Sequence, residues 1–525
     1  MSDRWFMKTF LLSIGLALVG LAGLDTPAPT YDQPYRPQYH FSPRKNWTND
    51  PNGLVYFAGE YHLFFQYNPF GDEWGHMSWG HSVSQDLLHW HELPVALPEQ
   101  NGIMIFTGST VVDQGNTSGF CSRGKPCLVA VYTGHTPANG ARRALQTQNL
   151  AYSNDKGRTW AKYAGNPVLN LNLPDFRDPK VFWSEQSKRW VMLVSLPDDH
   201  KVRIYGSPNL RNWEQLSEFG PAGATGGQWE CPELFEMQVN GTSDTRWVLK
   251  VGLNPGGLQG GSGEQYFVGR FDGRRFVNDN PPALTLWTDY GKDCYCALTF
   301  NGLPRGQAPI MIGWMNNWQY AAAIPTSPWR GQMTFPRRLS LRSTPDGIRL
   351  FQQPTDSLQH LREPPVNLTD QSVDQLNRNL SSAAFGKTRT FELRSTFPLG
   401  AAQEVGWKIL AHDGSSTIVG YDTQARQLFV DRTHSGVVGF HRDFPVRTAA
   451  PLSLSGKLLR LDILVDRCSV EVFADAGRIA MTNLVFPMAG EQKIEFYSKG
   501  GQPGPISVEL SEVRSIYSQK GANSF

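Results

Sequence analysis

The sequence of 525 residues has little charge and almost no imbalance of charge. Charged residues make up 18% of the chain, and the formal net charge is only +2. Proteins that bind nucleic acid usually carry a basic field that attracts phosphates, so this balance argues against a nucleic-acid partner. Cysteine is also scarce. Six cysteines in so long a chain exclude the class of small disulfide-rich scaffolds.

The few cysteines still allow local pairing. Cys121 and Cys127 enclose a short polar loop and could form a disulfide in an exported protein. Cys294 and Cys296 are two residues apart and would share one face of a strand. A zinc site would need further ligands nearby, and this part of the sequence offers none. No metal site is therefore expected here.

Long apolar runs are missing except near the N-terminus. Arg4 and Lys8 precede the apolar run from Phe10 to Leu24, and small residues follow at plausible cleavage positions. This run of 15 residues is shorter than the roughly 20 that a membrane-spanning helix needs. Residues 1–30 are therefore interpreted as a signal peptide and leader, although an uncleaved anchor stays open as an alternative. We expect a secreted or periplasmic protein with no membrane partner after cleavage.

Turn-forming and aromatic residues are plentiful instead. The chain contains 51 glycines and 36 prolines, and 12% of its residues are aromatic. This profile is typical of all-β proteins with many turns. A length of 525 residues favours two or more domains over one large core.

A degenerate repeat runs through the first two-thirds of the chain. The segments "SQDLLHW", "SNDKGRTW" and "SPNLRNW" end at Trp90, Trp160 and Trp213, and "FDGRRF" near Phe271 is a weaker fourth copy. Apolar strand-like runs flank each copy, and several strands per repeat at this spacing indicate the blades of a β-propeller. Residues 31–350 would hold five blades. The alternative is a set of unrelated hairpins in a large sandwich.

The character of the sequence changes after residue 350. Leu358 and Leu361 have helical spacing before two prolines, which predicts a linker helix within residues 351–365. Clear strands with alternating apolar residues follow, so residues 366–518 are predicted to form a β-sandwich. Residues 519–525 are a short tail.

Three carboxylates have unusual neighbours. Asp50 lies in "NDPNG", Asp178 in "DFRDPK" and Glu230 in "GGQWECPE". Each alone is best explained as an ordinary turn or loop acid. Their spacing, however, places them in different blades, whose inner strands converge on the propeller axis. A pocket with several carboxylates and tryptophans favours glycoside hydrolysis, in which one acid attacks the anomeric carbon and another protonates the leaving oxygen.

The sequence resembles the β-fructosidases of glycoside hydrolase family 32, which include invertases, exo-inulinases and levanases. The likeness covers nearly the whole mature chain. It rests on motifs in family order: "NDPNG", "FFQYNP", "WGHMSWGHSVSQDLLHW", "FTGS", "FRDPK", "WECPE", "QYFVGRFDG", "WMNNWQY", "IPTSPWRGQMTFPR" and "DRCSVEVFAD". It implies an all-β fold, a five-bladed β-propeller followed by a β-sandwich.

The resemblance also assigns roles to the three acids. It implies that Asp50 is the nucleophile, Glu230 the general acid/base and Asp178 the transition-state stabiliser. Six residues would line the fructose subsite: Asn49, Gln66, Trp74, Ser109, Arg177 and Trp314. Two ionised aspartates suit the positive charge that builds on the fructosyl ring, whereas Glu230 must hold a proton. No metal or organic cofactor is needed.

Some positions depart from the family pattern. Thr48 replaces an apolar residue, Thr107 replaces the serine of "FSGS", and Cys294 and Cys296 stand in the family's "DFYAA" run. These changes leave the preference among levan, inulin and sucrose open.

The predicted function is therefore an exo-acting, retaining β-fructofuranosidase that hydrolyses terminal fructosyl residues of fructans and of sucrose. Retention predicts that the carboxyl groups of Asp50 and Glu230 lie about 5 to 5.5 Å apart. The alternatives are a fructosyltransferase or an inactive fructan-binding lectin, and more distantly a propeller adaptor or an arabinanase. Oligomeric state is not predicted.

Overall fold

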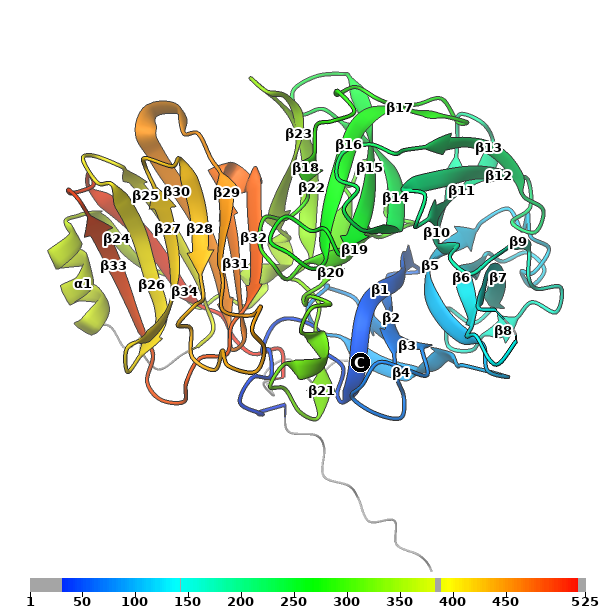
Figure 1. The fold of residues 1–525 in the computed structure, drawn as a ribbon, viewed down its shortest axis with the longest axis horizontal. Helices are drawn as coiled ribbons and strands as arrows, with labels where there is room; N and C mark the ends of the chain where they lie inside the picture. The colour runs from blue at the N-terminus through cyan, green and yellow to red at the C-terminus, as the bar shows by residue number, and fades with distance from the viewer. Residues whose placement is uncertain (1–30, 142, 383–388, 518–525) are drawn as a thin grey trace, which may run out of the picture. The chain divides into compact units, whose positions relative to one another are not determined.

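The structure, a computed structural model, describes residues 31–141, 143–382 and 389–517 (Figure 1). The expected signal peptide and C-terminal tail lie outside these residues. Strands dominate the described chain, and its one α-helix is α1 (Val373–Ser382). No described helix is long and apolar enough to cross a membrane.

Five sheets follow one another along the chain from blue to green in Figure 1 and form the propeller. The first contains β1 (Asn46–Phe57), β2 (Glu60–Tyr67), β3 (Ser78–Ser84), β4 (His91–Leu97) and the late strand β21 (Trp329–Arg330). The second contains β5 (Met104–Asp113), β6 (Cys127–Thr136), β7 (Leu145–Ser153), β8 (Ala161–Lys162) and β9 (Leu169–Leu173). The third contains β10 (Arg177–Ser184), β11 (Arg189–Leu196), β12 (Lys201–Ser207) and β13 (Glu214–Phe219).

The last two propeller sheets have the same up-and-down order. The fourth contains β14 (Gln228–Gln238), β15 (Thr245–Asn254), β16 (Gly263–Phe271), β17 (Phe276–Asn278) and β18 (Leu286–Trp287). The fifth contains β19 (Tyr295–Thr299), β20 (Ile310–Trp314), β22 (Arg337–Thr344) and β23 (Gly347–Pro354), with the 3-10 helix η1 (Ala321–Ala323) after β20. The prediction of five blades is confirmed, and the alternative of unrelated hairpins in one large sandwich is excluded.

The sequence repeat marks the same turn in successive blades. Its copies connect the third strand to the fourth in the first three sheets, and the weaker copy joins β16 to β17 in the fourth. Serine or aspartate oxygens close these turns: Gly157 N–H donates to Ser153 Oγ (2.8 Å), and Asn209 N–H donates to Ser207 Oγ (3.1 Å). Trp160 then donates through Nε1 to the carbonyl of Gly157 (3.0 Å). The repeat therefore stabilises the turn between two strands of a blade and contains no residue of the predicted site.

The first strands of the five sheets contact one another in a closed ring, from β1 through β5, β10, β14 and β19 back to β1. Each of these first strands has a β-bulge at an equivalent position. Across the bulge, a step of three residues along the first strand matches a step of two residues along its partner strand. The bulges span residues 48–51, 105–108, 177–180, 230–233 and 295–298. A bulge leaves one residue outside the ladder and redirects a side chain. Equivalent bulges thus turn side chains from all five blades toward one region.

The sandwich follows a short connection. β23 continues to Pro354, past the expected boundary at residue 350, and the 3-10 helix η2 (Asp356–His360) comes next. One sheet has the order β24 (Val366–Gln371), β34 (Ile506–Glu512), β25 (Phe391–Pro398), β30 (Leu458–Asp466), β31 (Ser469–Ala474) and β32 (Ile479–Leu484). The other has the order β29 (Arg447–Pro451), β28 (Gln427–Asp431), β27 (Ser415–Asp422), β26 (Glu404–His412) and β33 (Lys493–Lys499). The 3-10 turns η4 (Ser455–Lys457) and η5 (Asp475–Gly477) flank β30 and β31.

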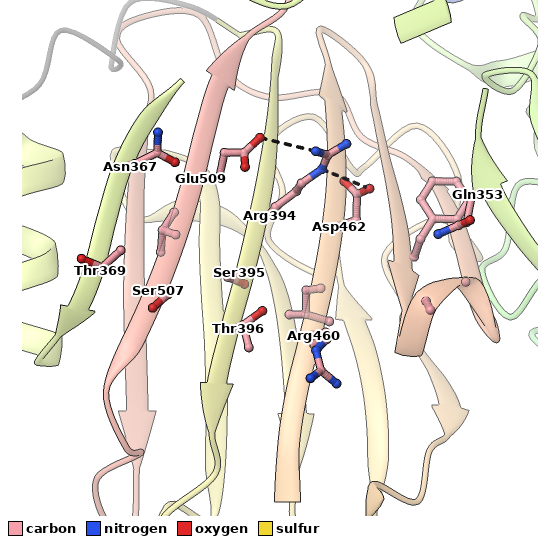
Figure 2. Close-up of a pocket in the computed structure, with 15 residues that line it drawn as sticks. Gln353, Asn367, Thr369, Arg394, Ser395, Thr396, Arg460, Asp462, Ser507 and Glu509 are labelled. Carbon is pink, nitrogen blue, oxygen red and sulfur yellow. Dashed lines mark hydrogen bonds and ion pairs between the residues drawn. The ribbon is translucent and has the colours of Figure 1, made fainter. Parts of the chain in front are cut away.

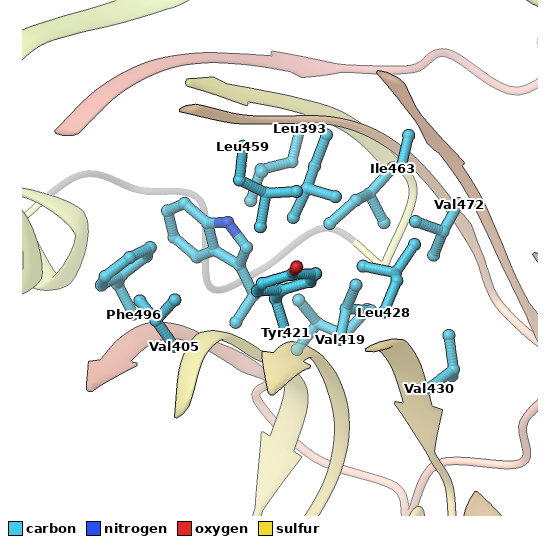
Figure 3. Packing of buried hydrophobic residues seen from close by; sticks show 14 of the residues in the cluster. Leu393, Val405, Val419, Tyr421, Leu428, Val430, Leu459, Ile463, Val472 and Phe496 are labelled. Carbon is cyan, nitrogen blue, oxygen red and sulfur yellow. The ribbon is translucent and has the colours of Figure 1, made fainter. Parts of the chain in front are cut away.

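The core of the sandwich lies between these two sheets. Figure 3 shows Leu393, Leu459 and Ile463 of the first sheet facing Val405, Val419 and Leu428 of the second. Alternate residues of each strand supply this apolar layer, as the period of two in the sequence predicts. The predicted fold class, a five-bladed propeller followed by a sandwich, is confirmed.

Buried ion pairs join the sandwich to the fourth and fifth blades. Arg337 of β22 pairs with Asp289 (2.9 Å) and with Glu471 of β31 (2.6 Å), and all three side chains are buried. Arg432 pairs in the same way with Asp293, two residues before Tyr295 in the ring of first strands. Removing one partner from such a buried pair leaves an uncompensated charge. The sandwich therefore supports the start of β19.

Candidate active site

A cavity of about 360 Å³ opens where the bulged strands converge. Residues from the first four blades and from the loop after β20 line it. They are Asn49, Asp50, Gln66, Trp74, Phe106, Thr107, His135, Gln146, Asp175, Arg177, Asp178, Glu230, Asn254 and Trp318. The structure thus brings together the three acids and four of the six predicted subsite residues, Asn49, Gln66, Trp74 and Arg177.

Asp50 is held from one side only. Thr107, in the equivalent bulge of the second blade, donates its hydroxyl to Asp50 Oδ2 (2.6 Å). The other oxygen, Oδ1, is buried and forms no hydrogen bond of standard geometry with any residue described in the structure. Trp47 Nε1 donates to Asn49 Oδ1 (2.7 Å) and so orients the neighbouring amide. Thr107 therefore fixes one oxygen of Asp50.

Asp178 is fixed by its own bulge and by the next one. Its backbone has φ +67°, a conformation that places the side chain away from the ladder direction. Thr133 Oγ1 accepts from its backbone N–H (3.0 Å), and its Oδ2 accepts from the backbone N–H of Cys231 (2.8 Å). The bulge of the fourth blade thus positions an acid of the third.

Glu230 is held by two donors from different blades. Arg177 directs Nε and Nη2 at Glu230 Oε1 (3.0 and 2.9 Å), and Tyr295 of β19 donates its hydroxyl to Oε2. Arg177 is itself fixed by Asp175 (2.5 Å) and by Gln228 (2.7 Å). Two-point contacts of this kind set the direction of a carboxylate. Arg177, Glu230 and Tyr295 occupy the same first position of their bulges.

The pKa values of the two aspartates in the cavity are raised. Burial raises the pKa of Asp50 to about 6; the hydrogen bond from Thr107 opposes this shift, and the charge of Glu230 adds to it. Burial also raises the pKa of Asp178 to about 7, against the charge of Arg177. Glu230 and the aspartates hold the pKa of Arg177 above its ordinary value although burial acts against it. Burial is the main cause of the two aspartate shifts, and the charges of the neighbouring acids add to it.

A disulfide lies beneath the acids. Cys231 and Cys296 are bonded, and both are buried. Cys231 Sγ is 3.7 Å from Asp50 Oδ2. Because the two sulfurs are bonded to each other, they offer no thiolate to a metal ion. The sequence placed Cys296 near the pocket but did not reveal its partner, which is 65 residues away. The second disulfide, Cys121–Cys127, closes a polar loop as the short spacing allowed.

Aromatic rings form the rim of the cavity. Trp74 is 47% exposed, and its ring centroid lies 6.1 Å from that of Phe106. Phe106 stacks on His135 at 4.4 Å. Exposed ring faces of this kind suit the apolar faces of sugar rings. Phe106, His135 and Gln146 were not anticipated from the sequence. Phe106 begins the motif "FTGS", but no quoted motif contains His135 or Gln146.

Two predicted subsite residues do not line the cavity. Ser109 lies beyond the bulge of β5, where its Oγ accepts from the backbone N–H of Val181 (2.9 Å) and links the second and third blades. Trp314 lies on β20, the second strand of the fifth blade, and packs behind Tyr295 against Trp47 and Trp318. Trp318, four residues later on the loop, lines the cavity instead.

Two other acids near the ring are excluded as alternatives to Glu230. Glu233 and Glu264 are fully buried, and neither lines the cavity. Lys180 pairs with Glu233 (2.6 Å), and Lys250 pairs with Glu264 (3.0 Å). Carboxylates that are held by lysines in the interior cannot reach a substrate.

The sandwich has a cavity of its own, of about 410 Å³, on the outer face of its six-stranded sheet. Figure 2 shows Arg394 between Asp462 and Glu509, with which it pairs at 3.6 and 3.4 Å. Short polar side chains of neighbouring strands, such as Thr369 and Ser507, surround this group. No aromatic side chain of this cavity is exposed, and its two acids Asp462 and Glu509 are both paired with Arg394.

Comparison with known proteins decides the family. The N-terminal-domain profile of glycosyl hydrolases family 32 matches residues 40–354, and the C-terminal profile matches residues 357–515. The chain belongs to glycosyl hydrolases family 32. The resemblance stated from the sequence is confirmed, and the chain is a glycoside hydrolase.

Relatives in this family match over most of their length. The chain is 45% identical to a levanase of Bacillus subtilis over 495 residues, which are 93% of this chain and 72% of the levanase. It is 42% identical to an extracellular exo-inulinase of Aspergillus niger over 532 residues, covering 95% of this chain and 98% of that protein. The crystal structure of the exo-inulinase from Aspergillus awamori superposes with a TM-score of 0.86 at 40% identity, covering 93% of this chain and all of that one.

Proposed function

We propose that this family 32 hydrolase is an exo-acting, retaining β-fructofuranosidase that removes terminal fructosyl residues from fructans and from sucrose. The single observation that carries the proposal is the cavity at the bulged ring. In it Asp50, with one oxygen fixed by Thr107, shares one space with Glu230 and Asp178. The names of the relatives, levanase and exo-inulinase, point to fructans as the substrate class.

The geometry suggests how the reaction proceeds. A carboxylate oxygen of Asp50 attacks C2 of the fructosyl ring, and the bond from C2 to the leaving oxygen breaks as Glu230 gives that oxygen a proton. The covalent fructosyl–Asp50 ester is then hydrolysed by water, from which Glu230 takes back a proton. Asp178 carries negative charge beside the ring while positive charge develops there. Arg177 and Tyr295 keep Glu230 directed at the leaving oxygen throughout.

The size and rim of the cavity support exo action. A cavity of about 360 Å³ suits the end of a chain better than its middle. Trp74 and Phe106 at the rim would contact the sugar next to the cleaved bond. We therefore expect fructose as the main early product.

The protein is also proposed to be secreted. The relative from Aspergillus niger is named extracellular. Residues 1–30, which carry the expected signal peptide, lie outside the described part of the chain.

Product analysis tests the proposal directly. Sucrose, inulin and levan are each incubated with the enzyme, and the products are separated by anion-exchange chromatography from the first minutes onward. Fructose alone as the early product from the polymers supports exo hydrolysis. Mixed oligosaccharides at early times would reject exo action, and products longer than the substrate would make the enzyme a fructosyltransferase. No release from any of the three would favour the inactive lectin.

Retention is tested separately. Methanol added to the reaction intercepts the covalent intermediate, and a retaining enzyme yields methyl β-fructofuranoside. The α-anomer would indicate inversion. A crystal structure with bound fructose should also place the carboxyl groups of Asp50 and Glu230 about 5 to 5.5 Å apart.

A further inference from the structure

The buried disulfide and the hydrogen bond on Glu230 connect the same two bulges. Glu230 and Tyr295 occupy the first position of the bulges in the fourth and fifth blades, and the Tyr295 hydroxyl donates to Glu230 Oε2. The second position of each bulge is a cysteine, and Cys231 is bonded to Cys296. One covalent link and one hydrogen bond therefore run in parallel between adjacent blades.

The two bulges have backbone conformations that such a link can hold in place. Cys231 has φ +48° and Cys296 has φ +45°, in the left-handed region that non-glycine residues seldom occupy. Each bulge also removes a residue from its ladder, so regular hydrogen bonds no longer fix it. Strained conformations persist only where surrounding contacts over-determine them. The sulfur–sulfur bond supplies one such contact directly beside Glu230.

The disulfide also affects the nucleophile. Cys231 Sγ lies 3.7 Å from Asp50 Oδ2, and both cysteines are buried. A disulfide sulfur carries no hydrogen, so it offers Asp50 no donor. After reduction, a Cys231 thiol at this distance could donate to the carboxylate and compete with Thr107. The oxidised form therefore leaves Thr107 as the side chain that fixes this oxygen.

We propose that the Cys231–Cys296 disulfide is a positioning element for catalysis: it locks the bulges of the fourth and fifth blades so that Tyr295 holds Glu230 at the leaving oxygen. The inference rests on the proposed role of Glu230 as acid/base. Tyr295 and the disulfide act through Glu230 and need no contact with substrate. The alternative is a disulfide that only stabilises the fold.

The other disulfide provides a matched control. Cys121–Cys127 also links two cysteines within the propeller, but Cys127 pairs with Asp113 at the far end of β5 from the bulge at Thr107. At about 3.3 Å per residue, this end of the strand is well outside the cavity. Replacing either pair removes one cross-link, and only one of the two pairs borders the site.

The experiment compares the full-length enzyme with Cys231→Ala/Cys296→Ala and with Cys121→Ala/Cys127→Ala. For each, kcat/KM is measured on sucrose and on a fructoside with an aryl leaving group, well below the melting temperature and with a chelator present. The aryl group leaves with little protonation, so it reports on Asp50 alone. We expect Cys231→Ala/Cys296→Ala to lose about 10- to 100-fold on sucrose and much less on the aryl fructoside. The control pair should retain wild-type values on both substrates.

Tyr295→Phe gives a second, independent measurement that keeps the disulfide. It should show the same selective loss on sucrose, and in the Cys231→Ala/Cys296→Ala background it should add little, because both changes release Glu230. If the double alanine variant does not fold, the conservative pair Cys231→Ser/Cys296→Ser takes its place in the comparison. Thiol titration of the unfolded wild-type protein should find two free thiols, from Cys294 and Cys468.

Three outcomes would overturn the inference: four free thiols in the wild type, equal losses on both substrates, or an unchanged substrate ratio in Tyr295→Phe. The proposed function is checked in parallel with Glu230→Gln. If Glu230→Gln shows no dependence on the leaving group, the role of Glu230 itself is wrong. If the loss depends on the leaving group in Glu230→Gln but not in the cysteine and tyrosine variants, only the positioning role of the disulfide and Tyr295 is wrong.

Discussion

The cavity on the propeller ring and the cavity on the outer face of the sandwich are similar in size, about 360 and 410 Å³. Each contains a carboxyl group whose pKa is raised by burial to about 7, Asp178 in the first and Asp462 in the second. A carboxyl group with a raised pKa in a cavity therefore does not by itself identify an active site.

The backbone makes the difference between them. The sandwich cavity lies on one sheet, where regular strands place Arg394 and Asp462 directly opposite each other and the charges pair. In the propeller, equivalent bulges of separate sheets aim several acids at one space, where Arg177 alone faces them. Convergence of strands from different sheets concentrates charge that one sheet face would neutralise.

The largest effect expected from this comparison is on Asp50. Asp50→Asn should lower kcat on every fructoside by about 10⁴-fold or more, because no covalent intermediate can form. Asp462→Asn is the matched change in the sandwich cavity and should keep normal activity. Steady-state kinetics on sucrose and on an aryl fructoside measure both variants. Substantial turnover by Asp50→Asn would remove it as the nucleophile.

Glu230→Gln should show a smaller and substrate-dependent loss. Sucrose cleavage should fall by about 10²- to 10⁴-fold, as expected when a general acid is removed. An aryl fructoside should still form the intermediate, and added azide should then release it as a fructosyl azide. The assay follows aryl release with and without azide. Equal losses on both substrates without rescue would show that Glu230 is not the acid/base.

The pH profile tests the shifted nucleophile. Because Asp50 and Asp178 must both be ionised and their pKa values are about 6 and about 7, kcat/KM should begin to fall below pH 7 and fall more steeply below pH 6. Thr107→Val removes the hydrogen bond that stabilises the ionised form, so it should move this limb to higher pH. Profiles of kcat/KM on the aryl fructoside, which depend least on Glu230, measure the shift. A limb near pH 4 in the wild type would contradict the raised pKa.

Buried acids in the site should also cost stability at high pH. The pKa of Asp178 is raised in the folded state, so its protonated form stabilises the fold; this contribution is present below about pH 4 and is lost as pH rises through about 7. Asp178→Asn should therefore raise the free energy of unfolding at pH 8 by about 1 to 3 kcal/mol while lowering activity. Thermal unfolding at pH 8 and at pH 5 measures it. A stabilisation that is equal at both values would exclude the charge as its cause.

The smallest expected effect on activity comes from substitutions in the sandwich cavity. Asp462→Asn and Arg394→Ala should change kcat/KM on sucrose by no more than about twofold, because distant sites act independently. Initial rates on sucrose and on inulin provide the measurement. A loss of activity on inulin alone would show that this cavity takes part in binding the polymer. The two cavities would then differ only in that the propeller cavity also carries out the reaction.

The sequence by itself determined the five blades, the sandwich and the three acids. Hydrogen-bonded turns ending in tryptophan mark the first three blades, and a weaker copy marks the fourth, because such turns depend only on neighbouring residues. Asp50, Asp178 and Glu230 lie in distinctive local motifs. The bulges were not predicted, although they bring these acids together. A bulge shows itself only when a strand is paired with its neighbour.

The tertiary structure alone decided which side chains meet. Ser109 and Trp314 belong to the family motifs, yet strand order places one between blades and the other behind Tyr295. Tyr295 reaches Glu230, and Cys296 bonds Cys231, only because the propeller closes its fourth blade against its fifth. The physical reason is the period of two along a strand. One extra residue in a bulge turns the following side chains to the other face, and no local pattern in the sequence records that turn.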